Sequence, residues 1–463
     1  MLAYNLIDRS YSELLKPLEY NQHAPPLFLL VERLIVSHLG HGEKALRLQS
    51  LAAGIVSVLL FGSLARRLLN ERAALVATML FALSPLLIRY SAEVKPYSGD
   101  LLCAVMLVLA SSVSDPRRTL SVGCLVPLSV AGIIAILYSF PSAFVLMGLG
   151  PYLFYQAWSS RNQQACWAIV AAGACWLSCF LAYMWFFGRH SLGNRELMGF
   201  WDHAFLPFPP KSLYEARSAV LLVAEMLRWP VGFDGWQLPA LLMLIGLTRG
   251  HAGADHARLT ALAVLGVLLA VSTAKLYPLS DRLTLFTAPF ICLIIGLGTD
   301  RALATARNRG LFFAATCLIL ALSQIFLLRD RFTGDDLKGF GTRQALEAAF
   351  HACGTDERVY VYHEVFPVFE FYAKLGMFPE SHVIRGVDGV VDWREYRRQI
   401  QDLHGPVCFV FGDVKRYRVN ERELILFELD QRGKQLAEKK IGNAYVYKYY
   451  LEQSSTHASL SQP

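Results

Sequence analysis

Long apolar runs separated by short polar loops fill the chain from residue 46 to residue 328. Most runs hold about 18 residues, and a helix of that length crosses a hydrocarbon layer roughly 30 Å thick. Backbone groups in lipid must find hydrogen-bond partners within the protein, so helices are the expected spanning elements. The pattern predicts ten spanning helices, at 46–67, 73–90, 99–113, 119–137, 140–157, 164–187, 236–249, 258–275, 283–298 and 310–328.

Composition supports the same class of protein. The 463 residues are 54% hydrophobic and 17% charged, and the mean hydropathy is +0.36. A typical soluble domain is less apolar and has about 25% charged residues. The net charge of +7 comes with no basic stripe on a soluble face, so no nucleic-acid partner is expected. Membrane lipids are the expected surroundings.

The arginines of the short loops indicate the orientation of the chain. They occur in every second loop, and short loops rich in Arg and Lys face the cytoplasm. The segments 1–45, 91–98, 188–235 and 276–282, and everything after about 329, are therefore expected outside. The cytoplasmic arginines are Arg66, Arg67, Arg72, Arg117, Arg118, Arg161, Arg249, Arg258, Arg301, Arg307 and Arg309.

The external N-terminal segment is expected to contain a helix that does not span. This segment is 1–45, and its apolar stretch 24–39 is interrupted by Glu32 and Arg33. Sixteen residues with charges in the middle are typical of a helix that lies in the membrane interface. The transmembrane domain, 46–328, follows it.

Two further external parts are expected. The loop 188–235 is long for a membrane connector and holds a second interfacial helix at 213–229. Residues 329–452 alternate short β-rich runs with helical patterns, which predicts a small α/β domain. The tail 453–463 is expected to be disordered. The strands of the α/β domain are predicted at 358–362, 381–385, 406–411 and 443–450, and its helices at 364–374, 391–403 and 419–431.

The nine cysteines predict no metal centre. Seven lie in or beside apolar runs, where Cys behaves as a small apolar residue. Cys353 and Cys408 lie in the external domain and could pair in an oxidising compartment, but the apolar, strand-like run around Cys408 argues against a disulfide. No CxxC motif or His/Cys cluster indicates a metal site, and no cofactor is expected.

A first cluster of candidate site residues lies in the external loop 89–100. Glu93, Lys95, Tyr97 and Asp100 stand within eight residues between two apolar runs. Ionisable groups at the mouth of a helix are costly to place and mark a functional site by default. We interpret them as a site for phosphate and sugar hydroxyls. A solvated turn with snorkelling charges is the plain alternative.

A second cluster, Tyr277 to Arg282, stands between two late apolar runs, and Trp201 lies in the long external loop. The planar, permanently charged guanidinium of Arg282 suits phosphate oxygens. An aromatic belt with an arginine anchor is the alternative, because Trp and Tyr favour membrane interfaces. Glu19, before the first interfacial helix, is a further carboxylate that could act as a base.

Several motifs in fixed order resemble those of one family. They are Ala-Pro-Pro-Leu-Phe-Leu-Leu from Ala24, Ser-Pro85-Leu-Leu-Ile-Arg-Tyr90, Ser-Ala-Glu93-Val-Lys95-Pro-Tyr97-Ser, the Trp201 loop and Tyr277-Pro-Leu-Ser-Asp-Arg282. The order resembles the GT-C glycosyltransferases of the dolichyl-phosphate-mannose/ArnT-like type, most densely over 14–160. The resemblance implies a protein built of spanning helices with an extracytoplasmic active site. Together with the residue pattern, it predicts an α-helical polytopic membrane protein with about ten transmembrane helices and a small C-terminal extracytoplasmic α/β domain.

The resemblance also implies an activity. Such an enzyme moves a sugar from a polyprenyl-phosphate carrier to an extracytoplasmic acceptor, with inversion, at the surface of a bacterial inner membrane. The acceptor is an unknown glycan, lipid or protein. Lys95 and Arg282 would stabilise the departing phosphate, and Glu93 or Glu19 would take the acceptor proton.

The start of the chain departs from the family pattern. The family usually opens with a spanning helix and an external Asp-Glu pair, and Met1 stands just after the place of that pair. We expect either a start site placed too far downstream or a truncated and inactive chain. A secondary transporter or lipid flippase is the rival class, although no internal repeat of the kind that transporters show is present.

Overall fold

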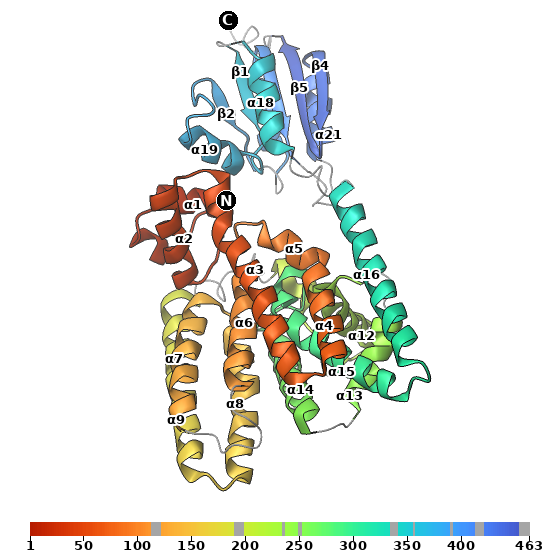
Figure 1. Cartoon of the computed structure of the whole chain (residues 1–463). Coiled ribbons are helices and arrows are strands. Elements are labelled where there is room, and N and C mark those ends of the chain that lie inside the picture. The colour runs from red at the N-terminus through yellow and green to blue at the C-terminus, as the bar shows by residue number, and fades with distance from the viewer. Residues whose placement is uncertain are drawn as a thin grey trace, which may run out of the picture. The chain divides into compact units, whose positions relative to one another are not determined.

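The chain forms a helical N-terminal unit and a C-terminal unit that contains a β-sheet (Figure 1). The computed structural model describes residues 1–112, 122–188, 199–233, 237–248, 252–333, 341–354, 357–388, 392–412 and 421–452. The two units are Tyr4–Leu328 and Arg329–Pro463. The predicted disordered tail, 453–463, lies outside the described residues.

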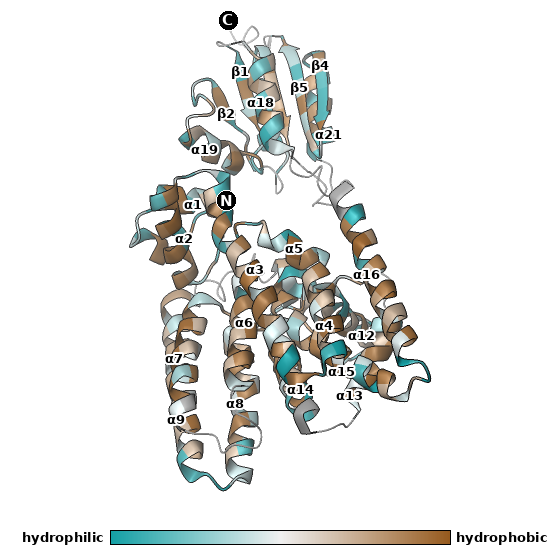
Figure 2. Ribbon diagram, viewed as in Figure 1, coloured by the Kyte–Doolittle hydropathy of each residue, from teal (hydrophilic) through white to brown (hydrophobic). Residues whose placement is uncertain are grey.

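Helices occupy all of the predicted apolar runs of the N-terminal unit. Figure 2 shows hydrophobic residues along most of their length. They are α3 (Glu43–Leu68), α4 (Glu71–Leu83), α5 (Pro85–Ser91), α6 (Tyr97–Ser112), α7 (Val122–Tyr138), α8 (Ser142–Ser159), α9 (Gln163–Tyr183), α13 (Gln237–Leu247), α14 (Ala252–Thr273), α15 (Ala288–Thr305) and α16 (Arg309–Thr333).

The predicted number of ten spans is not confirmed. Within the described residues, five helical segments are long and apolar enough to cross a membrane, and six if α4 and α5 count as one bent span. The helices α6, α13 and the described apolar part of α7 are shorter. The five segments are Glu43–Leu68, Gln163–Gly188, Asp255–Thr273, Asp281–Thr305 and Arg309–Asp330.

The apolar run predicted as a single helix at 73–90 is two helices that meet at an angle of 50°. Pro85 has no backbone N–H and its ring would clash with a preceding helical turn, so α4 ends before it. Ser84 then caps α5: its hydroxyl accepts from the N–H of Leu87 at 3.5 Å and donates to the carbonyl of Pro230 at 3.1 Å. The bend places the end of α5 beside the first candidate cluster.

The segment Asp281–Thr305 is the most buried of the five candidate spans, because 89% of its most apolar stretch lies inside the protein. It consists of the 3-10 helix η5 (Asp281–Thr287) and α15. Gly246 of α13 and Gly298 of α15 allow these two helices to touch backbone to backbone. A Cβ at Gly298 would lie 1.7 Å from the carbonyl oxygen of Leu242, and one at Gly246 would lie 2.1 Å from that of Ile294.

The N-terminal unit also contains several short helices. The two stretches predicted as interfacial helices are helical, as α2 (Pro26–Leu39) and α12 (Leu213–Arg228). The remaining short helices of this unit are α1 (Leu2–Asp8), η1 (Glu13–Leu15), η2 (Met184–Gly188), η3 (Asp202–Ala204) and η4 (Trp229–Val231).

The C-terminal unit is an α/β domain with a five-stranded sheet in the order β2-β1-β3-β5-β4. Strands β1, β2 and β3 run parallel, and β5 pairs antiparallel with both β3 and β4. The elements are α18 (Thr342–Ala352), β1 (Arg358–Val361), α19 (Phe366–Lys374), β2 (Val383–Arg385), α20 (Arg394–Gln401), β3 (Gly405–Phe411), α21 (Glu421–Asp430), β4 (Gly433–Ile441) and β5 (Ala444–Leu451).

Two elements of this domain were not predicted from the sequence, α18 and the edge strand β4. Most residues of β4 are exposed, so its sequence lacks the alternation of apolar and polar residues that marks a half-buried strand. Cys353 and Cys408 form a disulfide, although the position of Cys408 in an apolar strand argued against one.

Candidate functional site

Backbone and side-chain bonds clamp two of the predicted motifs together. The N–H of Leu279 donates to the carbonyl of Ala204 at 2.7 Å, and the N–H of Leu206 donates to the hydroxyl of Ser272 at 3.1 Å. Lys275 forms an exposed ion pair with Asp202 at 3.2 Å. The loop around Trp201 is thereby held against the loop that leads into η5.

The clamp brings the side chain of Arg282 over Trp201, with the guanidinium carbon 5.8 Å from the ring centroid. The positive charge of Arg282 also acts on Lys95 and on Tyr97, which belong to the loop between α5 and α6 and to the start of α6. Trp201 and Lys95, which lie 81 and 187 positions before Arg282, are thus gathered in one place. The structure therefore joins the two clusters that the sequence presents separately. Lys95, Tyr97, Trp201 and Arg282 are called the joined cluster below.

Lys95 is held by polar groups from two earlier segments. Its ammonium donates to Gln22 Oε1 at 2.6 Å, and its carbonyl accepts from the hydroxyl of Ser50 at 3.0 Å. Burial, together with the charge of Arg282, lowers the pKa of Lys95 to about 8. Gln22 was not predicted as a site residue, and no local signal marks it, because the contact joins residues 73 positions apart.

The two candidate bases occupy different places. Glu93 pairs with Arg89 at 3.4 Å, and its negative charge acts on Lys95, so it belongs to the joined cluster. Glu19 pairs with Arg9 at 3.4 Å and its side chain is about half exposed. Within the described residues, the side chain of Glu19 makes no hydrogen bond or ion pair with Lys95 or Arg282.

Tyr97, Asp100 and Tyr277 are more deeply placed. Tyr97 packs edge-on against Tyr90, with ring centroids 5.2 Å apart. Asp100 is buried, and its Oδ1 has no hydrogen-bond partner within the described part of the chain. Tyr277 is buried too, its hydroxyl donates to the carbonyl of Leu283 at 2.9 Å, and burial raises its pKa well above the usual range. Tyr277 and Asp100 are therefore buried residues that accompany the joined cluster.

A polar hollow of about 140 Å³ lies beside Arg282. It brings two carboxylates, Glu225 of α12 and Asp281, to the same place as His203. Asp281 adopts a positive φ of 29°, which a residue with a side chain seldom does and which often accompanies a functional site. Glu225 was not predicted as a site residue, because a charged residue in an amphipathic helix such as α12 gives no local signal.

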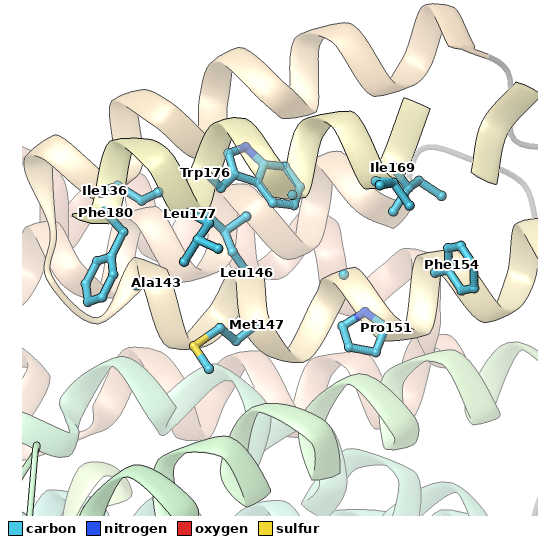
Figure 3. A pocket seen from close by; sticks show the side chains of 13 residues that line it. Ile136, Ala143, Leu146, Met147, Pro151, Phe154, Ile169, Trp176, Leu177 and Phe180 are labelled. Atoms are coloured by element: carbon cyan, nitrogen blue, oxygen red, sulfur yellow. The ribbon is translucent and has the colours of Figure 1, made fainter. Parts of the chain in front are cut away.

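A larger apolar groove of about 450 Å³ runs between α8 and α9 (Figure 3). A Cβ added at Gly150 or Gly173, which both line it, would meet no atom within 4 Å. One groove residue, Phe180, contacts Phe140, and Phe140 stacks on Tyr277 with ring centroids 5.8 Å apart. A chain of aromatic rings therefore connects the groove with the joined cluster.

Comparisons with known proteins found one family match and several similar folds. Residues 23–186 match the model of a family described as dolichyl-phosphate-mannose-protein mannosyltransferase. The crystal structure of ArnT from Cupriavidus metallidurans bound to undecaprenyl phosphate superposes with a TM-score of 0.53 at 14% identity, over 95% of this chain and 89% of that chain. The apo state of the same protein gives 0.53 at 14% identity, over 100% and 94%. No curated protein matches the sequence.

The family match includes Glu93 and Lys95, and the similarity of fold extends over nearly the whole chain. The chain therefore resembles the GT-C membrane glycosyltransferases, by the family match over 23–186 and by its fold over nearly the whole chain. The resemblance that the motifs indicate is confirmed.

Proposed function

We propose that this chain transfers a sugar from a polyprenyl-phosphate carrier to an acceptor on the extracytoplasmic side of a bacterial inner membrane. One observation carries the proposal. The positive charge of Arg282 acts on Lys95, although the two residues are distant in sequence. Two cations placed close together repel each other, so their pairing is favourable once an anion lies between them.

The anion we place there is the phosphate of the donor. When the bond between the sugar C1 and the phosphate oxygen breaks, the phosphate takes the electron pair and gains negative charge. Lys95 and Arg282 stabilise that charge in a partly buried site, where electrostatic interactions are stronger than in water. The leaving group is already a good anion, so it needs no proton from an acid.

The acceptor hydroxyl or amine attacks C1 from the face opposite the phosphate, which inverts the configuration. Its proton passes to a carboxylate, and Glu93 is the one in the joined cluster. Glu19 is the second candidate base, although it is paired with Arg9. We place the acceptor toward the polar hollow, where Glu225 and Asp281 can accept hydrogen bonds from sugar hydroxyls.

The apolar groove supports a lipid-linked donor. Its lining residues come from α7, α8 and α9, and its open glycines leave room for a branched hydrocarbon chain. Phe140 and Tyr277 continue the apolar path from the groove to the site. We place the isoprenoid chain of the carrier along this path.

The C-terminal domain is proposed to lie on the extracytoplasmic side. The arginines of alternate loops favour that orientation, and the Cys353–Cys408 disulfide suits an oxidising compartment. The domain is proposed to assist acceptor binding.

Reconstituted vesicles separate this function from that of a transporter or flippase. The purified chain is placed in liposomes with a polyprenyl-phosphate-linked sugar and a mixture of acceptors, and both free polyprenyl phosphate and sugar flux are measured. Release of polyprenyl phosphate without flux is expected. Flux of sugar or lipid with no cleavage of the donor would favour the rival class.

A further inference from the structure

The segment just before α2 reaches the joined cluster through one side chain. Gln22 accepts from the ammonium of Lys95 with its Oε1 at 2.6 Å, and its Nε2 donates to the carbonyl of Tyr20 at 3.0 Å. An ammonium can only donate hydrogen bonds, so the oxygen of the amide must face it. Both ends of the amide are therefore engaged. Gln22 lies immediately before the matched family segment, 23–186.

The turn that carries Gln22 has an unusual backbone. Tyr20 and Asn21 both have a positive φ, of 59° and 50°, which is uncommon for residues with a side chain, and more so for Tyr than for Asn. The N–H of Gln22 donates to the carbonyl of Glu19 at 3.3 Å and closes the turn. The ring of Tyr20 packs edge-on against Tyr4, with centroids 5.8 Å apart. Such a backbone persists only where its surroundings hold it.

The first helix and the residue after it hold this turn in place. Asn5 of α1 is completely buried. Its Nδ2 donates to the carbonyl of Glu19 at 3.4 Å, and its Oδ1 accepts from the N–H of the same residue at 2.9 Å. Arg9 donates to the carbonyl of Pro17 at 2.8 Å. The N-terminal segment therefore fixes the backbone from which Gln22 extends.

Lys95 is held at both ends by different segments. Its carbonyl accepts from the hydroxyl of Ser50 in α3 at 3.0 Å, and its ammonium donates to Gln22. A lysine side chain is a flexible four-carbon stem, and fixing it costs rotamer entropy. The contact with Gln22 meets this cost before a substrate arrives. An ammonium has three donors, so one bond to Gln22 still leaves capacity for phosphate oxygens.

The amide of Gln22 adds no charge to the site. The charged groups that act on Lys95 are Arg282 of η5 and Glu93 of its own loop. A carboxylate at position 22 would neutralise the ammonium and repel a phosphate. A neutral acceptor orients the ammonium and leaves its positive charge available to an anion.

We propose that Gln22 is a positioning residue, which holds the ammonium of Lys95 in place for the donor phosphate and leaves the charge of that ammonium to the phosphate. The proposal rests on the proposed function, since that function gives Lys95 its role. Gln22 itself is assigned no contact with the substrate. The turn 19–22 is thereby a part of the donor site.

The first test measures Lys95 directly and needs no activity. The full chain in detergent is labelled with trace acetic anhydride over a range of pH, and the acetylation of Lys95 is read by peptide mass spectrometry. Only the uncharged amine reacts, so the midpoint of labelling follows the pKa of Lys95, which burial lowers to about 8.

Two variants of similar size are expected to move this midpoint in opposite directions. In Q22E the new carboxylate favours the charged ammonium, and the midpoint is expected at about pH 9 or above. In Q22M the acceptor is lost, and the midpoint is expected below that of the wild type. Gln164→Glu, at an exposed position in α9, is the matched control and is expected to leave the curve unchanged.

The second test is the pH dependence of kcat/KM for a lipid-linked sugar. The alkaline decline is expected to follow the same order, earliest in Q22M and latest in Q22E, and both variants are expected to be slower than the wild type at pH 7 by about tenfold or more. A role in the fold alone would not separate the two variants in this way.

A midpoint and a decline that match the wild type in both variants would overturn the proposal. A shift in the same direction in both would overturn it too, because it would reflect a general disturbance of the turn. Failure of the proposed function has a different signature. The wild type would then release no polyprenyl phosphate, although the labelling midpoints of Q22E and Q22M still move apart.

Discussion

The ammonium group of Lys95 lies where burial and a neighbouring cation both oppose its charge. Its pKa is lowered to about 8, so the group loses its proton close to physiological pH rather than far above it. A phosphate between Lys95 and Arg282 reverses this tendency, because it favours the charged form. Lys95 is thus a residue whose charge depends on whether the site is occupied.

Donor turnover is expected to depend on pH through this residue. Lys95 is charged below its pKa and neutral above it, so kcat/KM, which reports the free enzyme, is expected to fall above pH 8. In K95R the guanidinium keeps its charge, and the alkaline decline is expected to move above pH 9. A decline at pH 8 that is identical in both proteins would show that another group is responsible.

Glu32 is a buried acid, whereas Lys95 is a buried base. It lies in α2, its side chain is completely buried, and neither carboxylate oxygen has a partner within the described residues. Burial raises its pKa to about 8. The folded protein therefore prefers the protonated carboxyl group, which needs no counter-ion.

This shift predicts a pH-dependent loss of stability. The folded pKa is above the ordinary value of 4.5, so the contribution of Glu32 is full below about pH 4.5 and is lost as the pH rises through 8. Glu32→Gln removes the titration, and its thermal stability is expected to exceed that of the wild type increasingly from pH 5 to pH 8. Glu71→Gln, at an exposed acid, serves as the control. Parallel stability curves for wild type and E32Q would contradict this account.

The site residues illustrate what a sequence can and cannot reveal. Lys95, Glu93 and Arg282 stand out because charges beside apolar runs are rare and costly. Gln22, the partner of Lys95, and Glu225, in the polar hollow, have no such local signal. Their proximity to the site follows only from the packing of distant segments.

At the scale of elements, contact between α13 and α15 depends on two glycines. The Cβ of an alanine at position 298 would come within 1.7 Å of the carbonyl oxygen of Leu242. Small residues allow this close approach of helices in membrane proteins.

Gly298→Ala is therefore expected to push α13 away from α15 and to destabilise the protein by about 1–3 kcal/mol. The loss is read as a lower temperature of thermal unfolding in detergent. Gly266→Ala in α14 is the matched control, since its Cβ would meet no atom within 4 Å. Equal unfolding temperatures for the two variants would show that the helices do not pack as described.

The groove between α8 and α9 gives a prediction for substrate binding. Gly173→Leu fills space that is open in the wild type. The KM for a donor with a long isoprenoid chain is expected to rise roughly tenfold, the equivalent of about 1.4 kcal/mol. A donor with a short chain is expected to be used as before, and so is the long donor by Gly266→Leu. An unchanged KM would place the isoprenoid chain elsewhere.

Element boundaries also show where sequence patterns fail. The apolar run at 73–90 has no interruption in hydropathy, yet Pro85 divides it, because a proline acts through its backbone and not through its polarity. The strand β4 was missed for the opposite reason: it is an exposed edge strand rich in charges, and charges on an edge strand discourage pairing with other chains. Hydropathy detects buried runs, so it detects neither a break that the backbone of a proline causes nor a strand that is mostly exposed.

At the scale of the whole molecule, the class of protein follows from the sequence more readily than the number of spans. Apolar helices with an α/β domain after them were predicted, and both are present. The number of ten spans is not confirmed, because several of the apolar helices are shorter than a bilayer requires. The joining of two motif clusters depends on the complete fold of the N-terminal unit.

Donor cleavage by the purified chain tests the central claim most directly. Release of polyprenyl phosphate from a lipid-linked sugar is compared for wild type, K95A and R282A, with K44A and R217A as controls at exposed cations. The wild type and both controls are expected to release polyprenyl phosphate. K95A and R282A are expected to be slower by about 100-fold or more, with normal insertion into the membrane. Wild-type rates in both K95A and R282A would contradict the assignment of the joined cluster as the phosphate site.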